Sequence, residues 1–182
     1  MRMGHKLAVG GLLLVWGVGL VWAFWWFEGR HVRVFTTPAH FQAQPATPPY
    51  PTGQVQVVHV WQKGCPCNAG HEDYLRQMTE QYAAQGVAFA WSGASAQAPP
   101  EQLRNWPYWP IPKEWPDWPG APAILIWNAQ GELAYVGPYS ESSYCTPGNS
   151  LVEPVMRALL DGREVRITSQ DTLSCLCDLS DR

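Results

Sequence analysis

Residues 55–78 read VQVVHVWQKGCPCNAGHEDYLRQM and join two predicted elements. The near-continuous apolar run over residues 54–61 predicts a strand that is buried on both faces. From residue 68 to residue 85 the pattern becomes helical, with apolar side chains at spacings of three and four that mark one buried face. The sequence therefore predicts a strand, a turn that carries Cys65 and Cys67, and a helix that Asn68 can cap.

The two cysteines at the expected start of this helix indicate chemistry. The positive end of the helix dipole and the unpaired backbone N–H groups favour a thiolate and lower the pKa of a cysteine. We expect Cys65, the more exposed thiol, to attack a substrate and Cys67 to resolve the mixed disulfide. A metal site and a static pair of structural cysteines are the alternatives.

The rest of the chain continues the alternation of strands and helices. Residues 87–91, 123–127 and 132–137 predict further strands, the last two joined as a hairpin. Residues 99–106 predict a short helix, and residues 151–160 predict a terminal helix that ends before a glycine. This order of elements is typical of an α/β fold.

The N-terminal segment is expected to cross a membrane. Residues 7–27 contain no charged residue, and 21 helical residues span about 31 Å, which is one hydrocarbon core. Tryptophans gather near the end of this run, where an aromatic belt belongs. We expect an uncleaved anchor that follows a short cytoplasmic N-terminus (residues 1–6), with the rest of the chain outside the cytoplasm. A cleaved signal peptide is the alternative, but the run is long for one and no small-x-small site follows directly.

The anchor, the domain and the tail are separated by changes in composition. Residues 28–53 are polar and become rich in Pro, Gln and Ala, which indicates a linker. We place the folded domain at residues 54–165 and a C-terminal tail at residues 166–182. Residues 105–122, NWPYWPIPKEWPDWPGAP, alternate tryptophan with proline and exclude a regular element. They predict either a rigid loop packed on its own domain or an exposed aromatic platform for a partner.

Composition limits the possible functions. The net charge is −3 and there is no basic block, so nothing supports nucleic-acid binding. No glycine-rich phosphate loop is present, so no small-molecule cofactor is implied. All 5 cysteines follow the anchor, and because a purely structural set should be even, at least one thiol is expected to be free or reactive.

Two segments resemble the thioredoxin superfamily. VVHVWQKGCPC (residues 57–67) is similar to the strand that ends in Phe-Trp-x-x-Trp-Cys-x-x-Cys, with Trp61 at the family's tryptophan. APAILIWNAQGELAYVG (residues 121–137) is similar to the strand that begins at a cis-proline, here Pro122, and to its hairpin partner. The resemblance covers about residues 55–160 and implies a thioredoxin-like fold, a central mixed sheet flanked by helices. With the anchor, it is similar to the membrane-tethered extracytoplasmic thiol–disulfide oxidoreductases.

The resemblance also implies roles for individual residues, with three departures from the family pattern. One residue is missing between Cys65 and Cys67, and Gly64 stands where the family usually has tryptophan. His59 occupies the position of the family's buried acid, where it is either a proton shuttle or a hydrogen-bonded core residue. Pro122 would shape a groove in which an extended substrate pairs as a short strand.

The other cysteines leave three possibilities open. Cys175 and Cys177 repeat the Cys-x-Cys spacing, and this tail could reach back as a second redox pair, form a structural clamp or help to hold a metal. Cys145 is expected to be a free or paired structural cysteine, for example in a fixed disulfide with the tail, and a resolving role is the alternative. A copper or zinc site would draw its ligands from Cys65, Cys67, His71, Cys175 and Cys177. Related copper-delivery proteins use a histidine late in the fold, and none follows His71, which is itself expected to be exposed.

The function that the sequence supports best is a thiol–disulfide oxidoreductase that acts on protein disulfides through Cys65 and Cys67. Its predicted location is the cytoplasmic (inner) membrane, N-terminus inside, with the domain in the periplasm. The alternatives are a copper or zinc carrier and a non-catalytic module that binds partners through the Trp/Pro segment. A peroxidase is less favoured because Gln62, rather than threonine, precedes Cys65 by three residues.

Overall fold

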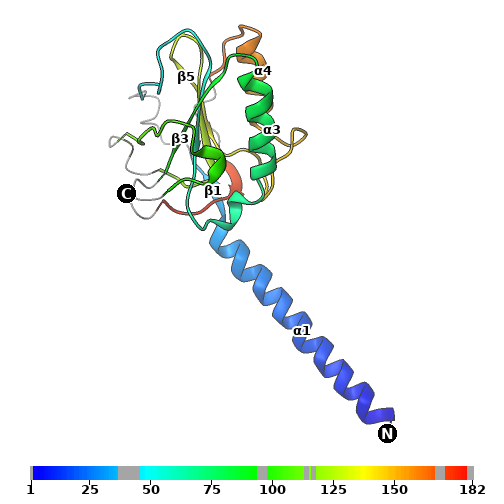
Figure 1. Ribbon diagram of the computed structural model, residues 1–182. Coiled ribbons are helices and arrows are strands. Elements are labelled where there is room, and N and C mark those ends of the chain that lie inside the picture. Colours follow the sequence, from blue (N-terminus) through cyan, green and yellow to red (C-terminus); the bar gives the residue numbers. More distant parts are fainter. Residues whose placement is uncertain are drawn as a thin grey trace.

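A long helix projects from an α/β domain in the computed structural model (Figure 1). The structure describes residues 2–36, 46–93, 98–112, 115, 118–166 and 171–179. Helix α1 (Arg2–His31) is exposed along nearly its whole length. Its segment Gly4–His31 is long and apolar enough to cross a membrane by length and composition. Of the predicted linker (residues 28–53), residues 37–45 lie outside the described residues.

The central sheet has four strands in the order β3-β2-β4-β5. Strand β2 (Gln56–Val60) pairs in parallel with β3 (Ala88–Ser92) and antiparallel with β4 (Ala123–Trp127), which in turn pairs antiparallel with β5 (Leu133–Gly137). Every residue of β2 is buried, as its apolar run predicted. The sheet is mixed, with a helix after β2 and another after β5, and this agrees with the central mixed sheet flanked by helices that the resemblance implied.

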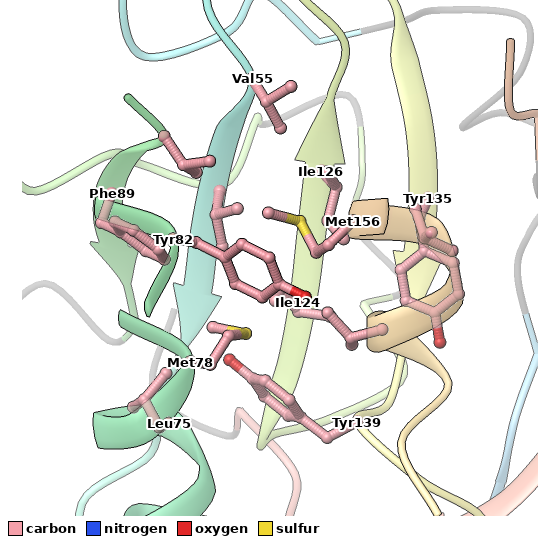
Figure 2. Close-up of a cluster of buried hydrophobic side chains, with 14 of the residues drawn as sticks. Val55, Leu75, Met78, Tyr82, Phe89, Ile124, Ile126, Tyr135, Tyr139 and Met156 are labelled. Atoms are coloured by element: carbon pink, nitrogen blue, oxygen red, sulfur yellow. The ribbon is translucent and has the colours of Figure 1, made fainter. Parts of the chain in front are cut away.

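Two α-helices cover one face of the sheet. Helix α3 (Glu72–Ala83) and helix α4 (Val152–Leu160) lie side by side against it (Figure 1). Figure 2 shows their side chains, among them Met78 and Met156, packed over Ile124 of β4. The predicted helix at residues 99–106 is only the 3₁₀ turn η2 (Glu101–Leu103), which follows Pro100.

Three tryptophans of the Trp/Pro segment lie against the other face of the sheet, whereas Trp106 packs against the first cluster, the one beneath α3 and α4. Trp109, Trp115 and Trp118 are buried in a second hydrophobic cluster together with Trp127 of β4. The Trp109 indole N–H donates to the carbonyl of Thr47 at 3.1 Å. These three indoles cover the sheet face that α3 and α4 leave open. The expectation of an exposed aromatic platform is therefore wrong for these side chains, and the packed-loop interpretation is correct.

A second, two-stranded sheet joins the segment that follows α1 to the C-terminal tail. Strand β1 (Val32–Phe35) pairs antiparallel with β6 (Thr172–Cys175), with Val32 opposite Cys175. Both strands fall outside the domain limits predicted from the sequence, in the linker and in the tail. The linker prediction is wrong for β1, because Phe35 is fully buried in the second cluster and fixes this strand to the domain.

Candidate functional site

Four cysteines form one cluster in which the two Cys-x-Cys pairs run antiparallel to each other. Cys65 is bonded to Cys177 and Cys67 to Cys175, with Cα–Cα distances of 5.9 and 5.6 Å. The predicted partners Cys65 and Cys67 are therefore each bonded to the tail and not to each other. The structure does bring together the four cysteines that the sequence proposed as two redox pairs.

The turn that carries the first pair differs from the helix start expected there. Cys65 precedes the 3₁₀ turn η1 (Pro66–Asn68), and α3 begins only at Glu72. The Asn68 side chain donates to the carbonyl of Gln62 at 2.7 Å, so it does not cap α3. The field of a helix dipole falls off within one turn. The expectation that the dipole of helix α3 lowers the pKa of Cys65 is therefore wrong.

Gly64 explains one departure from the family pattern. Its φ of +73° lies in the left-handed region, which residues with a Cβ adopt rarely. A tryptophan at this position would strain the backbone immediately before Cys65.

The tail approaches the first pair as a short strand. Cys177 and Ala121 exchange two backbone hydrogen bonds, N–H to O=C, of 2.9 and 2.7 Å. The Ala121–Pro122 peptide bond is cis, as the resemblance implied. The Cys65 sulfur lies 3.6 Å from the carbonyl oxygen of Ala121, so the bond to Cys177 sits beside Pro122. The residue before the cis-proline is thus the backbone partner of a cysteine-containing strand.

The opposite edge of the tail is held by the end of α1. The N–H of Leu176 donates to the carbonyl of His31 at 2.7 Å, and Arg33 forms an ion pair with Asp178. Phe27, in the last turns of α1, packs against the cysteine cluster. The cluster therefore lies next to the end of the apolar helix.

Access to the sulfurs is unequal. Cys65 is 7% exposed, Cys67 is 1% exposed and Cys175 is 2% exposed, whereas Cys177 is half-buried. A reagent in solution therefore meets the Cys65–Cys177 bond before it meets the bond between Cys67 and Cys175.

Two buried histidines lie behind the cysteines. His59 is 3% exposed, and its Nδ1 lies 2.7 Å from the hydroxyl of Tyr139. Burial, and secondarily the nearby His71, lower the pKa of His59 to about 3. This histidine is neutral near pH 7, and the contact with Tyr139 favours the hydrogen-bonded core role over the proton-shuttle role.

His71 is buried, and the expectation that it is exposed is wrong. It is 2% exposed, and its Nδ1 lies 2.8 Å from the carbonyl oxygen of Cys67. Because a carbonyl oxygen only accepts, Nδ1 carries the proton. Burial lowers the pKa of His71, and the bond to Cys67 opposes this effect only partly. This contact ties the backbone of the cysteine turn to the start of α3.

The two remaining predicted residues lie in the main core. Trp61 is buried in the cluster beneath α3. Cys145 is a buried free thiol, separate from the four bonded cysteines. Burial raises the pKa of Cys145 to about 11, so it is a poor nucleophile near neutral pH. This geometry matches the structural role expected for Cys145.

The donor set for a metal is smaller than the one proposed from sequence. Among the described residues, the sulfurs of Cys65, Cys67 and Cys177 lie within 4.8 Å of one another. His71 does not belong to this group, and its Nδ1 is bonded to the carbonyl of Cys67. Any metal held here would have sulfur ligands, and only after the disulfides are reduced.

Sequence reasoning gave no working role to Ala121, Gly120 or Tyr139. Ala121 acts through its backbone and Gly120 through its lack of a side chain, so neither carries a chemical signature. Tyr139 follows His59 by 80 residues in the chain and lies just after β5. The pairing of β5 with β4, and of β4 with β2, brings the two side chains together. The sequence did carry a signal for the disulfides: the two Cys-x-Cys pairs have equal spacing, so each cysteine of one pair can bond to a cysteine of the other pair.

Comparison with known proteins supports the fold. The profile of a family described as "Domain of unknown function (DUF6436)" matches residues 34–179, which include β6 and the last two residues of β1. No curated protein matches the sequence significantly. A protein of Geobacillus kaustophilus, described as an uncharacterized conserved protein, is 18% identical with a TM-score of 0.51 and covers 70% of this chain and 77% of its own.

Two further solved structures are similar. A hypothetical protein of Sinorhizobium meliloti is 19% identical with a TM-score of 0.50, covering 84% of this chain and 93% of its own. A thioredoxin-family thiol:disulfide interchange protein of Chlorobium tepidum is 18% identical with a TM-score of 0.42, covering 60% of this chain and 81% of its own. The domain has a thioredoxin-like fold, as the strand order and the placement of α3 and α4 indicated.

Proposed function

Since this chain belongs to the DUF6436 family and has a thioredoxin-like fold, we propose that it is a membrane-tethered thiol–disulfide oxidoreductase that acts on protein disulfides. The observation that carries this proposal is the four-cysteine cluster beside Pro122, with Cys65 bonded to a strand that pairs with Ala121. A clamp that only fixes the tail could be placed at many positions on the domain. The cysteines instead lie on the turn after β2, where the thioredoxin superfamily has its reactive cysteines.

The exchange begins from the reduced protein. The Cys65 thiolate attacks one sulfur of a substrate disulfide, a bond forms between Cys65 and that sulfur, and the other substrate sulfur leaves as a thiolate. A second protein thiolate, Cys67 or Cys177, then attacks the Cys65 sulfur and releases the substrate thiol. Both sulfurs lie within 4.8 Å of that of Cys65. The substrate gains two electrons and the protein gains one disulfide.

Because the cysteine cluster lies next to the end of α1, we expect it to act on substrates that are close to a membrane. Phe27 of α1 packs on the cysteines, and Leu176 of the tail is hydrogen-bonded to His31 at the end of the same helix. Helix α1 would lie in the cytoplasmic membrane with its N-terminus inside, and the domain would act in the periplasm, where disulfides persist.

The test of this function is catalysis of thiol exchange by the full-length protein in detergent micelles. We expect it to accelerate the reduction of insulin disulfides by dithiothreitol over the rate with dithiothreitol alone. Absence of any acceleration by a protein with confirmed disulfides would contradict the proposal.

A second candidate function, a thiolate metal site, is favoured by the three sulfurs that lie within 4.8 Å of one another. Thiolates select Zn²⁺ and Cu⁺, and a disulfide sulfur binds neither well. We expect the fully reduced protein, but not the oxidised protein, to retain one zinc ion per chain after gel filtration, as measured by elemental analysis. Equal zinc content in both forms, or none in either, would exclude a site built from these cysteines.

A further inference from the structure

We propose that the C-terminal segment 175–178 is a tethered substrate, which occupies the groove meant for an external polypeptide and exchanges its disulfides with Cys65 and Cys67. This inference rests on the proposed function and adds two elements to it. It names an internal redox partner, and it names the class of external substrate, an extended segment with an apolar residue directly before its cysteine.

The backbone of the tail is bound as a strand of substrate would be. Cys177 makes two hydrogen bonds with Ala121, one in each direction, while its sulfur is bonded to Cys65. Main-chain pairing gives affinity for any extended segment, and side-chain pockets give selectivity. The Cys65–Cys177 bond has the place of a mixed disulfide between enzyme and substrate.

The residue before the cysteine fills a pocket. Leu176 is fully buried in the second hydrophobic cluster, in contrast to Leu173 on β6, which is 55% exposed. A Cβ on Gly120 would lie 2.9 Å from the carbonyl oxygen of Cys177 and 3.1 Å from the Cβ of Leu176. The missing side chain of Gly120 therefore lets the tail approach this closely. When the tail leaves, an apolar pocket opens beside Ala121.

The electrons can move between the two pairs without loss or gain. An external dithiol first reduces the half-buried Cys65–Cys177 bond, giving two protein thiols and one external disulfide. The Cys177 thiolate then attacks the Cys67 sulfur, which lies within 4.8 Å, the bond between Cys67 and Cys175 breaks, and Cys175 leaves as a thiolate. The product has a Cys67–Cys177 disulfide, and Cys65 is reduced and ready for an external substrate.

The test compares Leu176→Ala with the matched surface variant Leu173→Ala, both as full-length protein in detergent micelles. Docking of the tail sets the effective concentration of Cys177 at Cys65. Truncating a buried leucine should lower the equilibrium constant for docking by about tenfold or more. In glutathione buffers we expect Leu176→Ala to need about a tenfold more oxidising ratio to form the Cys65–Cys177 bond. Leu173→Ala should match the unaltered protein.

The external substrate is tested with two synthetic ten-residue peptides, each carrying one cysteine capped as a mixed disulfide with glutathione. One has Leu before the cysteine and the other has Asp. Adduct formation on Cys65 of the reduced, unaltered protein should be at least severalfold faster with the Leu–Cys peptide, and this comparison requires no variant to fold. Leu176→Ala should accelerate it further, because the tail no longer competes.

The outcomes separate the two levels of the proposal. If both peptides form adducts on Cys65 at equal rates and Leu176→Ala behaves like Leu173→Ala, the tail is a structural clamp and this inference is wrong, while the proposed function stands. If neither peptide reacts with Cys65 in any variant, the proposed function itself fails.

Discussion

Cys65→Ser is expected to reduce the catalysed reduction of insulin to the rate of dithiothreitol alone. The serine hydroxyl has almost the size of the thiol, but it does not ionise near neutral pH and cannot form a mixed disulfide. The loss should be complete, because Cys65 is the sulfur beside Ala121 and Pro122 and the one from which both resolving thiols are within reach. The measurement is the initial rate at fixed protein and dithiothreitol concentrations.

Cys145→Ser is the matched control for this variant. It removes a thiol that is buried, unpaired and outside the cluster, whose pKa burial raises to about 11. Its rate should equal that of the unaltered protein. If Cys65→Ser keeps the full rate while Cys145→Ser loses it, the reactive thiol has been assigned to the wrong cysteine.

Acid is expected to destabilise the domain through His59. The pKa of this histidine is lowered from 6.5 to about 3 in the folded protein, so between these values the unfolded chain binds more protons. Stability is therefore fully present above pH 6.5 and falls as the pH decreases toward 3. The loss from His59 alone is about 2 kcal/mol between pH 6.5 and about pH 4.5. The lowered pKa of His71 adds to it in the same direction.

Denaturant unfolding of the oxidised protein across this pH range measures the effect. His59→Asn should flatten the dependence, because the residue that must stay neutral is gone. Tyr139→Phe removes the hydrogen-bond partner but keeps the buried imidazole, so its stability should be lower at every pH with the slope retained. A slope unchanged by His59→Asn would show that another group controls the acid response.

Local patterns were sufficient to predict the main sheet and its helices. The apolar run of β2 and the three-and-four spacing in α3 each depend on neighbours within one element. The bounds of β4 were predicted to the residue, because an apolar run there lies between Pro122 and a turn. The resemblance supplied the central mixed sheet flanked by helices and the cis bond before Pro122.

The features that the sequence did not predict depend on contacts between distant segments. β1 was assigned to a linker because its four residues are stabilised by pairing with β6, about 140 residues later, and by burial of Phe35 in a cluster of distant residues. His71 was expected to be exposed because its neighbours are polar, yet the carbonyl of Cys67 and the ring of Tyr139 enclose it. The crosswise cysteine bonds likewise need the tail to lie beside Ala121, which no local pattern encodes.

The most direct measurement is a redox titration of the full-length protein in micelles, with the disulfides mapped by mass spectrometry at each glutathione ratio. The proposed function predicts that the Cys65–Cys177 and Cys67–Cys175 bonds open and re-form reversibly. It predicts a midpoint well above about −300 mV, the level below which structural disulfides typically lie. Both bonds staying intact below that potential would identify a structural clamp and contradict the account.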